Sequence, residues 1–309
     1  MSTARAVVFA YHDVGVRCLQ VLLSARIEVP LVITVRDDPN ENQWFASVAD
    51  TARVYGLPVV MPDNANDPEL AGQVAALEPD FIFSFYYRSM LGAPILSSAR
   101  RGALNMHGSL LPKYRGRAPV NWAILNGERE TGATLHYMVE RADAGDIVDQ
   151  LAVPILDDDD AHAVFGKVTT AAEIILARSL PGLIAGDAPR RPQTIEPGQY
   201  FGRRSPEDGR IDWTQPALSI HNLVRAVAPP FPGAFTEVEG RQWWIHRTRV
   251  ERRIITPSER ARLFGVQGVC YAACRDGGVL RILEAETEEG PVDLARISSA
   301  LEAHPSVLG

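Results

Sequence analysis

An asparagine and a histidine lie two residues apart at the end of an apolar segment, Gly102–His107, that has the composition of a buried strand. Side chains two residues apart on a strand point to the same face, so Asn105 and His107 are expected side by side. An amide N–H can donate to a developing oxyanion, and an imidazole transfers protons near neutral pH. The pair therefore predicts acyl-transfer chemistry.

A carboxylate, Asp143, follows in the loop after an expected strand at 134–139. A carboxylate beside an imidazole fixes its orientation and raises its pKa. Asn105, His107 and Asp143 together would catalyse acyl transfer to an amine without a covalent intermediate. A Ser-His-Asp hydrolase using Ser109 is the alternative, but no G-x-S-x-G elbow surrounds that serine. Spacing alone leaves catalysis and ordinary structural roles for these residues equally open.

The elements that must position these residues alternate between short apolar runs and segments with helical spacing. The expected strands are 6–10, 31–35, 58–61, 81–85 and 102–107, and the expected helices are 16–25, 44–55 and 68–77. Continuous apolar runs that alternate with helices are typical of parallel sheets covered on both faces. We therefore expect a doubly wound, mostly parallel α/β domain, whose ligands bind at the carboxyl ends of the strands.

The second half of the chain changes character after a segment rich in proline and glycine, residues 181–197. Before it, four aspartates at 157–160 precede a helical stretch, where they suit a helix N-terminus better than a calcium loop. Beyond it, short β-type segments and the turn Asp276-Gly277-Gly278 indicate a small antiparallel β domain. We therefore divide the chain into a catalytic domain at 1–200 and a β domain at 201–309.

The overall composition narrows the class of protein. The 309 residues carry 31 basic and 38 acidic side chains, a net charge of -7, which argues against a broad nucleic-acid surface. Three cysteines are too few for a disulfide scaffold, and Cys270 and Cys274 lack a second ligand pair for zinc. No apolar run suits a signal peptide or a membrane helix. We expect a cytoplasmic protein without membrane insertion and without a metal.

The residues around the Asn–His pair resemble a known family. The pattern Asn-x-His-x-Ser-Leu-Leu-Pro at 105–112, followed by Asp143, is similar to the signature of the 10-formyltetrahydrofolate-dependent formyltransferases. The segments 83–88 and 202–208 resemble the branch that formylates UDP-4-amino-4-deoxy-L-arabinose in lipid A modification. The resemblance extends over almost the whole chain and implies a Rossmann-like formyltransferase domain followed by an OB-like β domain.

The resemblance also implies roles by matched position. Asn105 would stabilise the tetrahedral oxyanion, His107 would act as general acid or proton shuttle, and Asp143 would raise the pKa of His107. The co-substrate would be 10-formyltetrahydrofolate, and no metal would be needed. Its expected contacts are Ser89, Met90, Leu91, Arg117, Val139, Glu140, Arg141, Ala142 and Asp143. The candidates for contact with the UDP-sugar are Tyr11, His12, Arg203 and Arg204.

Two features favour a small UDP-amino sugar over tRNA as the acceptor of the formyl group. The loop at 36–42 is net negative where the tRNA formyltransferases carry a basic insertion, and phosphate neutralisation supplies much of the affinity for nucleic acid. The segment 11–13, Tyr-His-Asp, also replaces the Gly-Thr-Pro turn of the tRNA enzymes. Methionyl-tRNA formyltransferase, a formyltransferase for another amino sugar nucleotide and a non-catalytic folate- or UDP-sugar-binding protein remain the alternatives.

A basic cluster follows the expected catalytic strand, at Lys113, Arg115 and Arg117. Such a cluster is most often a solvated face, so we expect these side chains to be exposed, with Arg117 in contact with folate as the resemblance implies. We also expect Arg203 or Arg204 to assist the diphosphate of the UDP-sugar.

Overall fold

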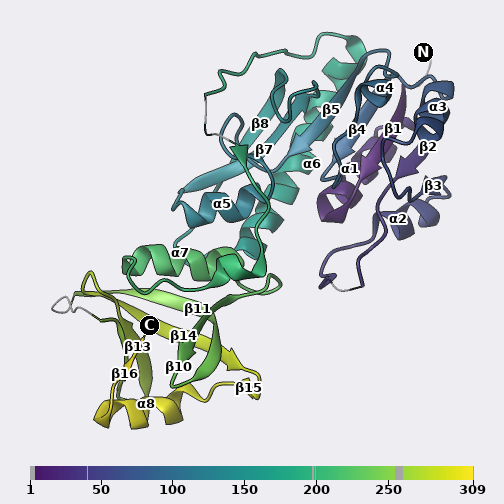
Figure 1. Ribbon diagram of the computed structural model, residues 1–309. Coiled ribbons are helices and arrows are strands. Elements are labelled where there is room, and N and C mark those ends of the chain that lie inside the picture. Colours follow the sequence, from purple (N-terminus) through teal and green to yellow (C-terminus); the bar gives the residue numbers. More distant parts are fainter. Residues whose placement is uncertain (1–3, 40, 197, 199, 255–259, 309) are drawn as a thin grey trace. The chain divides into compact units, whose positions relative to one another are not determined.

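A computed structural model of the chain describes residues 4–39, 41–196, 198, 200–254 and 260–308 (Figure 1). The chain forms two compact units. The first contains Met1–Pro119, Glu130–Val153 and Gly166–Gly202, and the second contains Val120–Arg129, Pro154–Phe165 and Arg203–Gly309. Two short segments from the first 200 residues therefore cluster with the second unit.

The first unit is built around a seven-stranded sheet with the order β3-β2-β1-β4-β5-β7-β8. Its strands are β1 (Arg5–Ala10), β2 (Glu28–Ile33), β3 (Val59–Val60), β4 (Phe81–Phe85), β5 (Gly102–His107), β7 (Glu130–Tyr137) and β8 (Ile147–Pro154). The strands from β3 to β5 pair in parallel, whereas β7 pairs antiparallel with β5. Its other elements are α1 (His12–Ser24), α2 (Val48–Val54), α3 (Pro68–Ala76), α4 (Ala93–Leu96), most of α6 (Ala161–Ala185), and the strand pair β6 (Arg115–Gly116) and β9 (Tyr200–Phe201).

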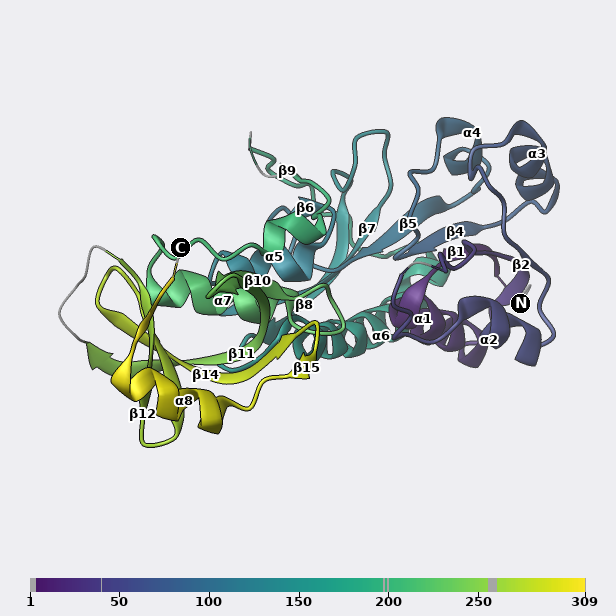
Figure 2. The same ribbon diagram turned by 60° about the horizontal axis from the view of Figure 1, so that its bottom comes forward.

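Helices cover both faces of this sheet (Figure 2). On one face, Phe9 and Ile82 belong to a buried cluster with Leu70 of α3. On the other face, α1 packs closely against β1, since a Cβ atom on Gly15 would lie 3.1 Å from the Cβ of Ala10. Burial on both faces explains why the strands read as continuous apolar runs. The doubly wound, mostly parallel α/β sheet predicted from the sequence is confirmed.

The strand order reverses between β1 and β4, so the chain leaves these two strands toward opposite edges of the sheet. Ligands of open α/β sheets bind at the carboxyl ends of the strands beside such a switch point. Here those ends carry the segment 11–13 after β1, the segment 86–88 after β4 and His107 at the end of β5. This edge of the sheet therefore positions the candidate site.

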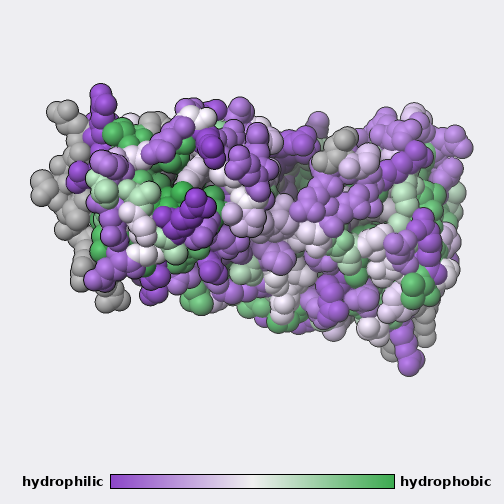
Figure 3. Space-filling model, turned by 90° about the horizontal axis from the view of Figure 1, so that it is seen from below, coloured by the Kyte–Doolittle hydropathy of each residue, from purple (hydrophilic) through white to green (hydrophobic). Residues whose placement is uncertain are grey.

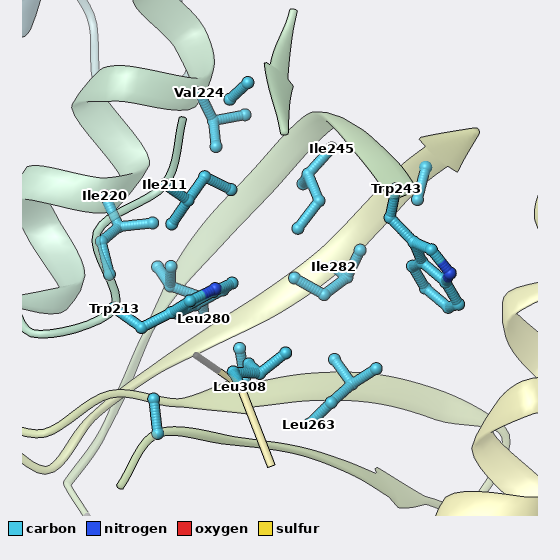
Figure 4. Close-up of a cluster of buried hydrophobic side chains, with 14 of the residues drawn as sticks. Ile211, Trp213, Ile220, Val224, Trp243, Ile245, Leu263, Leu280, Ile282 and Leu308 are labelled. Carbon is cyan, nitrogen blue, oxygen red and sulfur yellow. The ribbon is translucent and has the colours of Figure 1, made fainter. Parts of the chain in front are cut away.

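The second unit contains an antiparallel sheet with the order β10-β11-β14-β13-β12-β16, and β15 pairs with β14. Its elements are α5 (Pro119–Leu125), η1 (Pro206–Gly209), α7 (Ala217–Val227), β10 (Ala234–Val238), β11 (Arg241–Ile254), β12 (Arg262–Val266), β13 (Val269–Ala273), β14 (Gly278–Thr287), β15 (Gly290–Pro291), α8 (Leu294–Ala303) and β16 (Ser306–Val307). In its core, Ile220 and Val224 of α7 pack with Ile245, Leu280 and Ile282 of the sheet (Figure 4). The small antiparallel β unit predicted from the sequence is confirmed.

Helix α6 is the longest helix in the described part of the chain. It starts in the second unit, up to Phe165, and continues in the first. Asp160 caps it, because its carboxylate accepts a hydrogen bond from the Ala163 amide at 2.7 Å. By length and composition α6 is apolar enough to cross a membrane. In its most apolar 18-residue stretch, 44% of the residues are buried inside the protein, and a buried core helix meets the same criteria of length and composition.

The face of the molecule drawn in Figure 3 is mainly hydrophilic, with apolar residues in small separate groups. Exposed large apolar side chains, such as Val54, Met90 and Leu218, are scattered along the chain. Single exposed apolar side chains are normal on protein surfaces. The search for a functional site therefore starts from the polar groups at the carboxyl ends of the strands.

Candidate active site

The antiparallel pairing of β5 with β7 assembles polar side chains at the end of the sheet. Asn105 lies opposite His136, and His107 lies opposite Thr134. His107 and His136 are 6% and 1% exposed, so both imidazoles are removed from bulk water. His136 was not among the residues expected from the sequence, because its place opposite Asn105 depends on the register of β5 with β7.

Asp143 lies between the two imidazoles. Its Oδ1 is 3.7 Å from His107 Nδ1 and 3.6 Å from His136 Nε2, and its Oδ2 accepts a hydrogen bond from the Gly116 amide at 2.9 Å. The residue has a left-handed backbone conformation, with φ 52°, which aspartate tolerates better than most residues. Gln193 donates through Nε2 to the carbonyl oxygen of Asp143 at 3.1 Å. The carboxylate is thus fixed where it reaches both rings.

The electrostatics of this carboxylate follow from its neighbours. Burial raises the pKa of Asp143, but the positive charge of His107 and the hydrogen bond from the Gly116 amide outweigh burial. The pKa of that carboxyl therefore lies well below its usual range. Asp143 is ionised at neutral pH, and a buried carboxylate beside an imidazole stabilises the positively charged imidazolium.

His107 is held by the backbone on its other side. Its Nε2 lies 2.9 Å from the carbonyl oxygen of Tyr114, so Nε2 carries a proton and donates it to that hydrogen bond. Nδ1 faces Asp143 at a distance that suits an ion pair but exceeds a direct hydrogen bond. Nδ1 is therefore the ring nitrogen that can gain and lose a proton while the ring stays in place.

His136 orients the amide of Asn105. Nδ1 of His136 lies 2.9 Å from the carbonyl oxygen of Tyr137 and donates to it, which leaves Nε2 as an acceptor. Asn105 Nδ2 lies 3.1 Å from that Nε2 and donates one of its N–H groups. Because an amide has a second N–H, this hydrogen bond fixes the side chain and leaves one donor for a ligand beside His107.

The turn after β5 is fixed by Thr134 and Gln150. The hydroxyl of Thr134 donates to the carbonyl oxygen of Ser109 and accepts from the Leu111 amide, and Gln150 Nε2 donates to the same hydroxyl oxygen. Ser109 is fully buried, and its own hydroxyl donates to the carbonyl oxygen of Lys113 at 2.6 Å. The serine therefore serves the turn, which argues against the alternative of a Ser-His-Asp hydrolase.

The segment 89–91, expected to contact folate, follows β4 and is held by Asn66. The amide of Asn66 donates to the carbonyl oxygen of Met90 at 2.9 Å and accepts a backbone hydrogen bond just beyond the segment. The first two residues of the segment are exposed and the third is buried. Arg117 is exposed and donates to the carbonyl oxygen of Arg88 at 3.3 Å. The structure therefore brings Arg117 to the loop that leads into this segment.

The other expected folate contacts lie in the loop between β7 and β8. Val139, Glu140 and Arg141 are exposed, whereas Ala142 is half-buried. A cavity of about 330 Å³ opens beside this loop, lined by Leu96, Gly102, Ala103, Tyr137, Met138, Val139, Ala144, Gly145, Asp146 and Arg190. The loop that carries Asp143 thus borders a cavity of the size found for small-molecule sites.

Tyr11 and His12 lie at the switch point of the sheet, in an aromatic cluster. The ring of His12 stacks on Phe45 with centroids 4.0 Å apart, and Tyr11 packs edge-on against the same ring. The hydroxyl of Tyr11 donates to Asp37 at 2.8 Å, and the guanidinium of Arg88 lies over the tyrosine ring. Burial and the hydrogen bond to Asp37 raise the pKa of Tyr11. Both side chains lie at the ligand-binding edge, and their contact with a sugar stays a prediction.

Arg203 and Arg204 belong to the second compact unit. Arg203 is exposed, whereas Arg204 is half-buried, with its guanidinium 4.9 Å from the ring centroid of Trp122. Nη2 of Arg204 donates to the carbonyl oxygen of Asp208 at 2.8 Å, and burial lowers the pKa of this arginine. The contact of either arginine with a diphosphate stays a prediction.

The basic cluster after β5 is only partly the solvated face that the sequence predicts. Lys113 and Arg117 are exposed, but Arg115 is 4% exposed. Arg115 lies on β6, where it pairs with Tyr200 of β9. The prediction of a fully solvated cluster is wrong for Arg115, because a strand so distant in sequence is not visible in the local charge pattern.

Among the residues that the structure describes, thiols and acids form no further cluster that could bind a metal ion. The three cysteines are free and buried, and burial raises the pKa of Cys270 to about 11 and that of Cys274 to about 12. Within the described ranges, no group of three or more His, Cys, Asp or Glu side chains is arranged to hold a metal ion. The polar group at the end of β5 is therefore the best candidate for an active site.

Comparison with known proteins supports this choice. A family model for the formyl transferases matches residues 6–180, and a model for the formyl transferase C-terminal domain matches residues 203–295. The chain belongs to the formyl transferase family. The resemblance to formyltransferases found in the sequence, and the prediction of an enzyme of that kind, are confirmed at the level of the family.

The fold of this formyl transferase is similar to those of solved N-formyltransferases. One from Helicobacter canadensis, in complex with folinic acid and dTDP-3-aminofucose, is 20% identical with a TM-score of 0.71, over 91% of this chain and 99% of that one. WlaRD, a sugar 3N-formyltransferase solved with dTDP and 5-N-formyl-THF, is 21% identical with a TM-score of 0.70, over 91% and 97%. Glycinamide ribonucleotide transformylase 1 from Symbiobacterium toebii is 24% identical with a TM-score of 0.54, over 63% and 95%.

Proposed function

We propose that this formyl transferase transfers the formyl group of 10-formyltetrahydrofolate to the 4-amine of UDP-4-amino-4-deoxy-L-arabinose. The observation that carries the proposal is the grouping of Asn105, His107 and Asp143, an amide donor, an imidazole and an ionised carboxylate at the end of β5. Membership of the family supports formyl transfer. Two similar N-formyltransferases contain a folate derivative together with dTDP or a dTDP-amino sugar.

The three residues have separate roles in this reaction. The sugar amine attacks the formyl carbon, and negative charge develops on the formyl oxygen. The second N–H of Asn105 donates to that oxygen, and losing one such donor costs roughly 10²–10³ in rate. The bond between the formyl carbon and N10 of the folate then breaks. The amine loses a proton and the leaving N10 gains one, and His107 carries it at Nδ1, which contributes roughly 10²–10⁴. Asp143 stabilises the imidazolium while it holds the proton.

The residues around the site fit a folate, which would supply the activated formyl group. The cavity beside the loop 139–143, lined by the side chains of Met138 and Val139 and by the backbone of Gly145, would receive a planar ring. Ser89 and Met90 would contribute through their backbone, since their side chains are exposed. Arg117 has five N–H donors and an exposed guanidinium, which suits the anionic glutamate tail of the folate.

The choice of a UDP-sugar rests on the branch resemblance and on the acidity of the switch point. Asp37 accepts a hydrogen bond from Tyr11, and Glu41 forms an ion pair with Arg88. The acidic loop at 36–42 therefore contributes carboxylates to the edge where the acceptor must bind. Carboxylates attract the protonated amine of a sugar and repel the phosphates of tRNA. We propose that Tyr11 and His12 contact the sugar and that Arg203 or Arg204 assists the diphosphate.

The test is mass spectrometry of UDP-4-amino-4-deoxy-L-arabinose after incubation with the protein and 10-formyltetrahydrofolate. We expect the sugar to gain one formyl group, and only when protein and folate are both present. His107→Ala is the matched control, since it should abolish transfer and leave binding of UDP intact.

A dTDP-amino sugar and methionyl-tRNA, offered under the same conditions, test the other acceptors. Formylation of either one in place of the UDP-sugar would refute the proposed substrate. Binding of UDP and folate without transfer to any acceptor would instead show a non-catalytic binding protein.

A further inference from the structure

Arg115 is a buried cation, and two of its three guanidinium nitrogen atoms have no hydrogen-bond partner among the described residues. Only 4% of the residue is exposed. Its Nε and Nη1 atoms are buried and have no hydrogen-bond partner in the described part of the chain. Burial of an unpaired charge is strongly unfavourable, so a fold that retains such a group usually has a use for it.

The position of Arg115 places it beside the proposed active site. It is the neighbour of Tyr114, whose carbonyl oxygen holds His107, and of Gly116, whose amide holds Asp143. Across the strand pair lies Tyr200, and a Cβ atom on Gly116 would be 3.1 Å from Cζ of its ring. Arg115 is thus surrounded by backbone that also fixes the catalytic side chains.

The carboxylate of Asp143 affects the charge of Arg115 but does not satisfy these donors. Oδ2 of Asp143 accepts from Gly116, and Oδ1 faces the imidazoles of His107 and His136. Asp143 therefore offsets part of the charge of Arg115 without serving as its hydrogen-bond partner. Burial lowers the pKa of Arg115, and the positive charge of Arg141 lowers it further. The surroundings thus favour an added negative charge.

We propose that Arg115 binds an oxyanion group of one of the two ligands of this site, and that its Nε and Nη1 donors are satisfied only in the complex. The inference rests on the proposed function, which supplies two anionic ligands. A phosphoryl group of the nucleotide sugar and a carboxylate of the folate tail present the same chemistry to a guanidinium, which forms strong charge-assisted hydrogen bonds with both. Arg141 and Tyr200 also lie close enough to affect the charge of Arg115.

The decisive variant is Arg115→Met, which keeps an unbranched apolar side chain and removes the charge and the donors. Without ligand, this variant should melt at the same temperature as the wild type or at a higher one, because an unpaired buried charge is lost. With ligand, loss of hydrogen bonds from a charged donor should raise one dissociation constant about 10- to 100-fold. A structural arginine would give the opposite pattern, with a lower melting temperature and unchanged affinities.

Isothermal titration calorimetry with four probes identifies the anion. UDP is compared with uridine, and folinic acid is compared with its analogue that lacks the glutamate. If the diphosphate contacts Arg115, the variant loses affinity for UDP alone, and if the folate tail does, it loses affinity for folinic acid alone. Arg53→Met is the matched control, because Arg53 is an exposed arginine of the same unit with its own ion pair to Asp50.

Arg115→Lys provides a second, charge-preserving variant. It should fold and should bind the affected ligand with an affinity between those of Arg115→Met and the wild type. Affinities within twofold of the wild type for UDP and folinic acid in both variants would overturn the inference, as would failure of both variants to fold. Absence of formyl transfer by the wild type, with Arg115-dependent binding intact, would refute the proposed function alone.

Discussion

Replacement of Asp143 by asparagine tests whether the carboxylate charge drives the reaction. Asparagine has nearly the same shape, and its Oδ1 can still accept the hydrogen bond from the Gly116 amide. What the change removes is the negative charge that lies 3.7 Å from His107 Nδ1. The backbone of the loop should stay in place, since asparagine also tolerates the left-handed conformation found at this residue.

The expected size of the effect follows from that distance. At 3.7 Å and an effective dielectric constant of ~20, the attraction between a carboxylate and an imidazolium is about 4 kcal/mol. That energy corresponds to about 10³ in a rate constant. The same substitution beside the catalytic histidine of a serine protease costs roughly 10⁴. We therefore expect kcat to fall by about 10³ in Asp143→Asn.

The assay is steady-state formyl transfer at saturating folate, with kcat and KM determined separately. The KM for the amino sugar should change by no more than about threefold, because the missing charge acts on the proton carried by His107 and not on substrate binding. Asp187→Asn, at an exposed aspartate of the same unit, is the matched control and should retain wild-type rates. A loss of kcat smaller than tenfold, or a rise in KM at constant kcat, would refute the proposed role of Asp143.

Three further predictions concern other parts of the molecule. His136→Phe removes the acceptor of the Asn105 amide and should lower kcat about 10- to 100-fold. In an Asn105→Ala background the same change should cause no additional loss, and an additive loss in that double variant would contradict the role of His136. Gly108→Ala places a Cβ atom 1.7 Å from the hydroxyl of Tyr86 and should lower the free energy of unfolding by about 1–3 kcal/mol. The control Gly72→Ala in α3, whose Cβ atom would have nothing within 4 Å, should not lower the free energy of unfolding. Burial lowers the pKa of His221, so the unfolded chain binds this proton more readily and stability should fall as the pH drops below about 6.5. Thermal unfolding of His221→Gln between about pH 7 and pH 5 should show a weaker decline than that of the wild type, while the exposed control His162→Gln should match the wild type.

The spacing of apolar residues was enough to predict which segments form helices and which form strands, but it did not predict several of their boundaries. The expected helix at 44–55 begins only at Val48, because Ser47 caps it by accepting a hydrogen bond from the Asp50 amide. Phe45 lies outside the helix and stacks on His12 instead. Helical spacing of apolar residues does not distinguish side chains that face the core from side chains that join a distant aromatic ring.

In the candidate site too, residues could be predicted from their neighbours in the sequence, whereas contacts between distant segments could not. Asn105 and His107 could be found because alternation on one strand puts them on one face, and Asp143 because it follows the next strand. His136 could not be placed, since its contact with Asn105 depends on the antiparallel register of β5 with β7. Arg115 was misjudged for a related reason, since its burial accompanies pairing with Tyr200, far along the chain.

The three catalytic candidates are each held in place by hydrogen bonds from a different part of the fold. Asn105 is fixed from β7 through His136, His107 is fixed by the carbonyl oxygen of Tyr114, and Asp143 is fixed by the Gly116 amide and Gln193. Each group is thus held before any substrate arrives. Donors that are already oriented need no reorganisation when charge develops, and such preorganisation is the main source of electrostatic stabilisation in enzymes. The buried histidine and the strand pair of β6 and β9 are therefore as much a part of the proposed active site as the residues that would touch the formyl group.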